Sequence, residues 1–107
     1  MAMTKKEFNK LLRDATNFRK GILEGQPSKA MCFAVAAPLQ GYLSFTGLKC
    51  RLIEGGVGEW VHFWIELPDG TILDPTADQF ESPDGLKMPP VYIGKKPDWY
   101  LQEAIAL

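Results

Sequence analysis

Apolar residues recur at helical spacing near the start of the chain. They stand three or four positions apart, at Phe8, Leu11, Leu12, Ala15 and Phe18. Thr4 and Glu7 form a capping box in front of them, because each side chain can bond an amide that the first helical turn leaves free. Gly21 is typical of a helix end. The pattern predicts a helix between Thr4 and Gly21, with its apolar stripe in the core.

A second run, Ala30–Ala37, is apolar on almost every side and is expected to form a buried helix. Ser28 is a favourable N-cap, so this helix is predicted to begin near Lys29. Pro38 has no amide hydrogen and is expected to kink or break the helix. A continuation beyond the proline would stop at Gly47.

Short extended segments follow the two helices. Four strands are predicted, at Lys49–Glu54, Val61–Leu67, Thr71–Asp74 and Val91–Ile93. Gly55–Gly58 is expected to be a flexible loop between the first two strands. Residues 81–90 contain three prolines and are expected to be a loop. Asp98 is predicted to cap a last short helix through Ala104. Two helices followed by a mostly antiparallel sheet define an α+β fold.

The turn at Pro68–Gly70 fixes which side chains share a face of this sheet. If the loop contains three residues, Trp64 stands opposite Asp74, and His62 becomes a diagonal neighbour of Asp74. Diagonal neighbours on one face lie roughly 7–8 Å apart, within reach of a hydrogen bond between long side chains. A two-residue loop would place them on opposite faces. The three-residue turn therefore predicts a His62–Asp74 pair.

Composition and charge limit the partners of the protein. A chain of 107 residues with 46% hydrophobic and 23% charged residues is expected to form one globular domain, residues 1–107. Its formal net charge is −1 and its basic residues are scattered, so neither a nucleic acid nor a membrane is an expected partner. The N-terminus has no apolar segment typical of a secretory signal. Cys32 and Cys50 are therefore expected to be free thiols in a cytoplasmic protein.

Cys32 lies in about the first turn of the second predicted helix. Unpaired amides and the helix dipole stabilise an anion there, which lowers the pKa of a thiol. His62 is the only histidine and could act as the base, with Asp74 fixing its tautomer. Each residue also has an ordinary structural interpretation: a small core cysteine, a hydrogen-bonded histidine and a turn that ends a strand. A metal site is the least favoured interpretation, because paired ligand spacings are absent.

The order of these residues carries a resemblance to a known family. Papain-like folds use a cysteine at a helix start, then a histidine on one strand and an aspartate on the next. The stretches His62–Glu66, Asp69–Gly70 and Leu73–Thr76 resemble the transglutaminase-core signature, and Cys32–Ala34 resembles its nucleophile helix. The longer string Leu73–Phe80 also resembles small proteins of phages and bacteria. The likeness covers about residues 26–80, and two features depart from it: Ile72-Leu73 replaces a frequent aromatic, and the chain is short for the family.

This resemblance implies a papain-like α+β fold and a Cys-His-Asp triad of Cys32, His62 and Asp74. It also implies a cysteine-dependent enzyme that acts on an amide bond as a protease, amidase, glutamine deamidase or transglutaminase. A protein or peptide substrate is expected, without a cofactor or a metal. The alternative from another class is a catalytically idle binding module on the same scaffold, for example a phage protein that engages a host factor in the infected cell.

Three further residues are candidates for the surroundings of the triad. Gln26 stands six residues before Cys32, a spacing that resembles the oxyanion glutamine of papain-like proteases, and a polar turn residue is an equally good interpretation. Trp60 and Trp64 flank His62 and could line a substrate cleft. Core packing is at least as good an interpretation for one of the two tryptophans.

Overall fold

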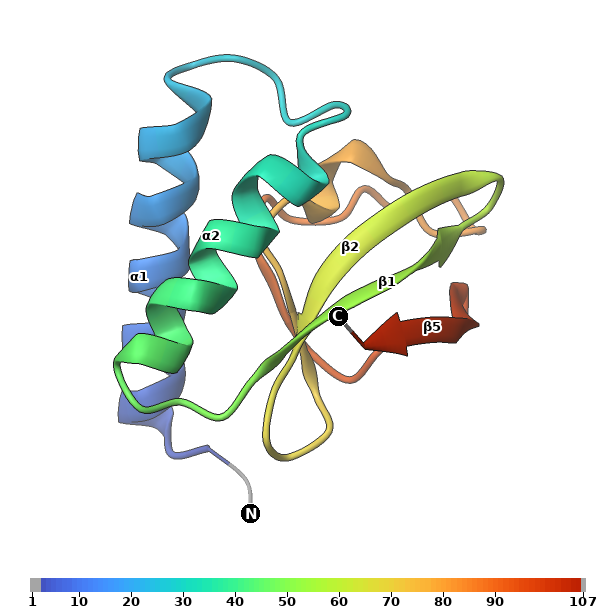
Figure 1. Ribbon diagram of the computed structural model, residues 1–107. Coiled ribbons are helices and arrows are strands. Elements are labelled where there is room, and N and C mark those ends of the chain that lie inside the picture. The colour runs from blue at the N-terminus through green and yellow to red at the C-terminus, as the bar shows by residue number, and fades with distance from the viewer. Residues whose placement is uncertain (1–2, 107) are drawn as a thin grey trace.

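The computed structural model describes residues 3–106 of the chain, and side chains up to residue 101. Two helices come first, five strands follow, and one turn of 3-10 helix lies between the third and fourth strands (Figure 1). In chain order the elements are α1 (Lys5–Leu23), α2 (Cys32–Phe45), β1 (Arg51–Val57), β2 (Trp60–Glu66), β3 (Ile72–Asp74), η1 (Ala77–Gln79), β4 (Tyr92–Gly94) and β5 (Tyr100–Ala106). The predicted α+β class is confirmed.

Helix α1 begins as the sequence predicts and ends later. Thr4 accepts a hydrogen bond from the Glu7 amide and donates its own amide to the Glu7 carboxylate, which completes the capping box. The predicted stop at Gly21 is wrong, because the helix continues to Leu23. Glu24 then takes the left-handed conformation at φ 49°, and its amide bonds the Lys20 carbonyl at 3.0 Å. A left-handed residue of this kind ends a helix even when it is not glycine.

Helix α2 starts at Cys32, three residues after the predicted start at Lys29. The predicted N-cap role of Ser28 is wrong: its buried hydroxyl donates to Asp78 at 2.6 Å instead. Pro38 lies inside the helix, which continues through it to Phe45. The late start places Cys32 in the first helical position, where the amides of the first turn have no partner within the helix.

The five strands form one curled antiparallel sheet in the order β4-β3-β2-β1-β5. The predicted loop at Gly55–Gly58 is wrong, since Gly55 and Gly56 belong to β1 and Val57 pairs directly with Trp60. Glycine is needed at position 55, because a Cβ there would overlap the ring of Trp64. The glycines thus make room for packing across the sheet and leave only a tight turn at its end.

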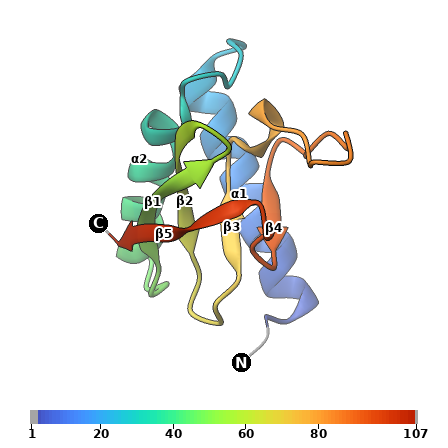
Figure 2. The ribbon, with the colours of Figure 1, turned by 90° about the vertical axis from the view of Figure 1, so that its right-hand side faces the viewer.

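The C-terminal segment is a strand and not the predicted helix from Asp98 to Ala104. β5 pairs antiparallel with β1, with Val57 opposite Tyr100 and a bulge between Glu54 and Gly56. In Figure 2 β5 runs in front of the rest of the sheet, with the helices behind. Pairing with a distant strand has overridden a local capping signal, which is a common limit of propensity.

Two apolar clusters lie on the two sides of the sheet. The larger one joins both helices to the sheet and contains Leu11, Ala15, Leu39, Leu43, Cys50, Ile65, Leu67, Leu73 and Val91. The smaller one lies under β5 and contains Ile53, Val57, Trp64, Ile72 and Tyr100. Within the described part of the chain, no helix is long and apolar enough to cross a membrane.

Candidate active site

His62 and Asp74 form a buried pair at the edge of the smaller cluster. Ile65 pairs with Leu73 and Glu66 with Ile72, which is the register of the three-residue turn. The Nε2 atom of His62 lies 2.7 Å from Asp74 Oδ2, and both side chains are fully buried. The predicted contact between these two side chains is confirmed.

Asp74 has two further hydrogen-bond partners. The amide of Thr76 donates to Oδ1 at 3.0 Å, because the backbone turns sharply after Pro75. The hydroxyl of Tyr100 donates to Oδ2 at 2.5 Å. Sequence reasoning missed Tyr100, since a helix was expected in its place and no local pattern links it to a residue 26 positions earlier. A buried carboxyl group with three hydrogen-bond partners is held in one orientation.

Cys32 stands at the first position of α2, is partly exposed and lies near enough to His62 for each to shift the pKa of the other. Burial raises the pKa of its thiol, but the imidazole of His62 and the amides of Phe63 and Phe33 outweigh burial and lower it. The thiolate is the nucleophilic form of cysteine. The arrangement therefore favours a reactive sulfur at a point that solvent reaches.

The two ring nitrogens of His62 have different surroundings. Burial lowers its pKa, but the hydrogen bond and charge of Asp74, aided by Cys32, raise the pKa to about 9. The Nδ1 atom is buried and forms no hydrogen bond within the described residues. Because Asp74 occupies Nε2, Nδ1 is the atom left to exchange a proton with the thiol or with a substrate. The two groups lower the pKa of the thiol and raise that of the imidazole, so each favours the charged form of the other.

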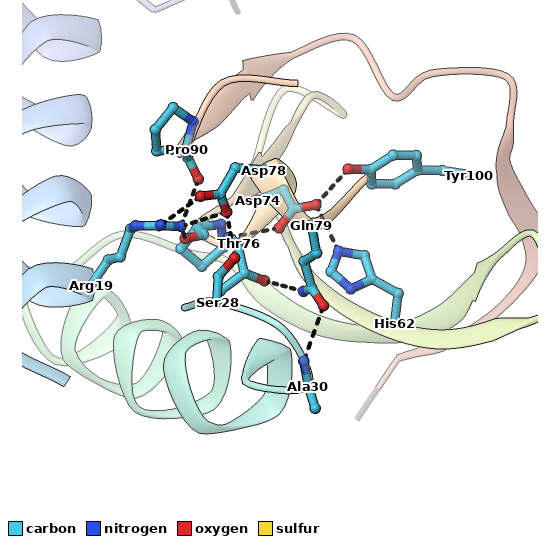
Figure 3. A network of polar contacts seen from close by, with 11 residues as sticks. Arg19, Ser28, Ala30, His62, Asp74, Thr76, Asp78, Gln79, Pro90 and Tyr100 are labelled. Carbon is cyan, nitrogen blue, oxygen red and sulfur yellow. Dashed lines mark hydrogen bonds and ion pairs between the residues drawn. The ribbon is translucent and has the colours of Figure 1, made fainter. Parts of the chain in front are cut away.

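A second polar network holds the loop that precedes Cys32 (Figure 3). Arg19 of α1 binds the Asp78 carboxylate with both terminal nitrogens, at 2.9 and 2.7 Å, and also donates to the carbonyls of Pro75 and Pro90. Ser28 adds its hydroxyl to the same carboxylate. Burial raises the pKa of Asp78, yet Arg19 and Ser28 lower it overall, so the carboxylate stays charged.

Gln79 connects this network to the site itself. Its side-chain amide donates to the Thr76 hydroxyl at 3.0 Å, and its carbonyl accepts the amide of Ala30 at 3.3 Å. Ala30 has a φ of 62°, which is uncommon for a residue with a Cβ. One side chain therefore ties the segment after Asp74 to the chain just before α2, at a point two residues before Cys32.

The remaining predicted residues lie in different surroundings. Gln26 is exposed in the turn after α1, and its side chain takes part in no hydrogen bond among the described residues. Trp60 is 70% exposed at the end of the β1–β2 hairpin, whereas Trp64 is 1% exposed beside Tyr100 and Gly55. Trp64 thus packs in the core, as was left open for one of the two tryptophans, and Trp60 remains a candidate for substrate contact.

These features define a class of site: a partly exposed thiol at a helix start, next to a buried and oriented histidine–carboxylate pair in an α+β domain. Comparisons with protein families, curated proteins and solved structures found no match for this chain. Among the described residues, no group of three or more His, Cys, Asp or Glu side chains could hold a metal ion. The functional assignment therefore rests on the geometry of the site.

Proposed function

We propose that this protein is a cysteine-dependent acyl-transfer enzyme that acts on an amide bond, with Cys32 as nucleophile, His62 as acid and base, and Asp74 as the orienting carboxylate. One observation carries the proposal. His62 is bound to Asp74 through Nε2 at 2.7 Å, while its buried Nδ1 has no other hydrogen-bond partner among the described residues, with Cys32 beside the ring. An unpaired buried nitrogen next to a thiol of lowered pKa suits proton transfer better than structural support.

The chemistry follows from this arrangement. The Cys32 thiolate adds to the amide carbonyl, and His62 as imidazolium protonates the departing nitrogen when the carbon–nitrogen bond breaks. A thioester on Cys32 and a free amine remain. His62, now neutral, takes a proton from the incoming acceptor as that acceptor attacks the thioester, and the thiol is released. Water as acceptor gives hydrolysis, and an amine gives a new amide.

The proposal includes the papain-like, transglutaminase-core arrangement of the fold. The order of elements supports it: a nucleophile helix, then a strand with the histidine, then a strand ending in the aspartate, joined by a three-residue turn. The exposed Trp60 and the half-exposed Phe33 next to Cys32 suit contact with a peptide or protein substrate.

A thiol-reactive acyl probe tests the proposal at neutral pH. Cys32 is expected to be acylated rapidly in the folded protein, while the buried Cys50 reacts only when the chain unfolds. The thioester should then break down in wild-type protein and persist when His62 is replaced by Ala. Equal labelling of both cysteines in the folded state would contradict the proposal, as would a thioester whose lifetime does not depend on His62.

A binding module without catalysis is the second candidate, and one observation favours it. Trp60 and Val61 are 70% and 64% exposed at the hairpin end, as contact residues of a protein interface often are. The two candidates differ in their dependence on Cys32. A partner that binds Cys32→Ala and wild-type protein alike, with no thioester formed by the wild type, would identify the module.

A further inference from the structure

Tyr100 reaches the site from β5, an element that has no part in the chemistry described above. Its hydroxyl donates to Asp74 Oδ2 at 2.5 Å, and the same oxygen lies 2.7 Å from His62 Nε2. The other carboxylate oxygen is bound by the Thr76 amide. Two donors thus share one oxygen. A donor that stabilises the negative charge of the carboxylate weakens the stabilisation that this charge gives to the imidazolium.

The position of Tyr100 is fixed by packing. The side chain is fully buried, and its ring lies edge-on to His62 and tilted against Trp64, with centroids 5.8 and 5.2 Å apart. The ring of Trp99 also packs against Tyr100, with the two centroids 4.9 Å apart. A phenol enclosed in this way needs a hydrogen-bond acceptor, and Asp74 is the one that the structure provides.

We propose that Tyr100 is a positioning residue, which holds Asp74 in place and weakens the hold of Asp74 on the His62 proton. An imidazolium that binds its proton too tightly delivers it slowly to a leaving amine. Tyr100 would therefore keep the pair oriented while leaving the proton transferable. The catalytic consequence rests on the proposed function, whereas the effect on proton affinity does not.

Other titratable groups surround the pair and must be separated from this effect. They are the Cys32 thiol from α2, Tyr92 from β4 opposite Asp74, Asp78 on η1, which is paired with Arg19 of α1, and Lys96, whose ammonium donates to the Tyr100 carbonyl at 2.7 Å. The residues that β1 adds to this cluster are apolar. Burial and the charge of Asp74 raise the pKa of Tyr100, so its hydroxyl remains a donor throughout the range in which His62 titrates.

The single histidine of the chain permits a direct test by NMR. In the Cys32→Ala background, where no thiolate is present, the imidazole signal of His62 reports its pKa without any activity assay. Tyr100→Phe should raise the pKa of His62 by about half a unit to one unit, because Asp74 then interacts with His62 alone. Tyr92→Phe is the matched control: its hydroxyl donates to the Lys95 carbonyl, and its removal should leave the pKa of His62 unchanged.

An unchanged or lowered pKa of His62 in folded Tyr100→Phe protein would overturn the proposal. If that variant does not fold, 3-fluorotyrosine can replace Tyr100 in a chain carrying Tyr42→Phe and Tyr92→Phe. The more acidic phenol is a stronger donor and should lower the pKa of His62, and a rise or no change would again overturn the proposal.

Turnover separates this inference from the proposed function. With Cys32 present, Tyr100→Phe should reduce kcat about 3- to 10-fold and move the alkaline limit of activity upward. A shift in the NMR titration without turnover in any variant would support the role of Tyr100 in proton affinity and contradict the enzyme. Turnover without that shift would support the enzyme and contradict the role of Tyr100.

Discussion

The two ends of helix α2 place two cysteines in opposite surroundings. At the N-terminal end, Cys32 is partly exposed, stands in the first helical position and faces the buried His62. Near the C-terminal end, Cys50 is buried in the apolar cluster between helices and sheet, with Ser44 Oγ at 3.7 Å and the Gln40 carbonyl at 3.8 Å. The same side chain is thus a polar, accessible thiol in one place and a core residue in the other.

This difference comes from the neighbours and not from the cysteines. The imidazole and the amides of Phe63 and Phe33 favour a negative charge on Cys32, while Cys50 is in contact with a hydroxyl and a backbone carbonyl. Charge-stabilising donors make a thiol reactive, and burial among apolar groups makes it inert. The candidate active site is therefore defined by donors that converge on one end of α2.

The largest expected effect is the difference in turnover between the alanine variants of the two cysteines. Cys32→Ala should reduce turnover by at least about 10³-fold, because the nucleophile is lost, and should lower stability by no more than about 1 kcal/mol. Cys50→Ala should leave turnover unchanged but destabilise the core by about 1 kcal/mol or more. Thermal melting and turnover are measured for both. Turnover that survives Cys32→Ala removes Cys32 from the chemistry, and a Cys32→Ala chain that unfolds makes Cys32 a structural residue.

The next effect concerns the carboxylate behind His62. Asp74→Asn retains much of the shape but removes the charge that favours the imidazolium, so turnover should fall on the order of 10²-fold or more. Substrate binding should change little. The pKa of His62 should drop towards or below its ordinary value of 6.5, which the imidazole NMR signal reports. A variant with full turnover and an unmoved pKa would mean that the His62–Asp74 contact is only structural.

The pH dependence should reveal the pair of charges at the N-terminal end of α2. The raised pKa of His62, about 9, means that the general acid is present below that pH, and turnover should decline up to tenfold per unit above it. The lowered pKa of Cys32 should move the acidic limb of the turnover profile, on which the thiolate forms, to a lower pH than an ordinary thiol would give. Alkylation of Cys32 should continue above pH 9, because it needs the thiolate but not the acid. Parallel profiles for turnover and alkylation would contradict this division of roles.

The free energy of unfolding should also depend on the titration of His62. A raised pKa of a base stabilises the fold at low pH, whereas a lowered pKa of an acid stabilises it at high pH. The pKa of His62 is higher in the folded chain than the ordinary value of 6.5, so the stabilisation is complete below about pH 6.5 and is lost as pH rises towards 9. In Cys32→Ala protein the free energy of unfolding should decrease by about 1–3 kcal/mol over that range. Adding Asp74→Asn should abolish the decrease.

The smallest effects distinguish two glutamines near the N-terminal end of α2. Gln79→Ala removes the hydrogen bonds to the Ala30 amide and the Thr76 hydroxyl, so the loop before Cys32 loses a restraint. Turnover should fall several-fold, and the free energy of unfolding should decrease by about 1 kcal/mol. Gln26→Ala should reduce kcat less than Cys32→Ala or Asp74→Asn, with the KM nearly unchanged, if backbone amides also bind the oxyanion. A wild-type kcat for Gln26→Ala would mean that backbone amides, and not the Gln26 side chain, bind the oxyanion.

Much of the site could be predicted because its geometry is local. The three-residue turn at Pro68–Gly70 sets the register of β2 and β3, and the register alone puts His62 and Asp74 on one face. The capping box at Thr4 is equally local, and it forms as predicted. In each case a few adjacent residues fix the dihedral angles, and only the choice between a two-residue and a three-residue turn had to come from the structure.

The wrong predictions have causes far away in the chain. Ser28 is a good N-cap by type, but the Asp78 carboxylate, held by Arg19, takes its hydroxyl and moves the helix start to Cys32. Gly55 belongs to a strand because the ring of Trp64 packs over it. Asp98 does not begin a helix, since the following segment pairs with β1.

The sequence by itself determined the α+β class, the order of the three candidate catalytic residues and, once the turn is taken to contain three residues, the pairing of His62 with Asp74. Tertiary structure alone decided that Cys32 stands at the first position of α2 beside the imidazole, and that Tyr100 reaches the Asp74 carboxylate from β5. The reason is the range of the forces involved. Turns and caps depend on neighbours along the chain, whereas a shared carboxylate oxygen depends on how the sheet curls and which distant strand completes it.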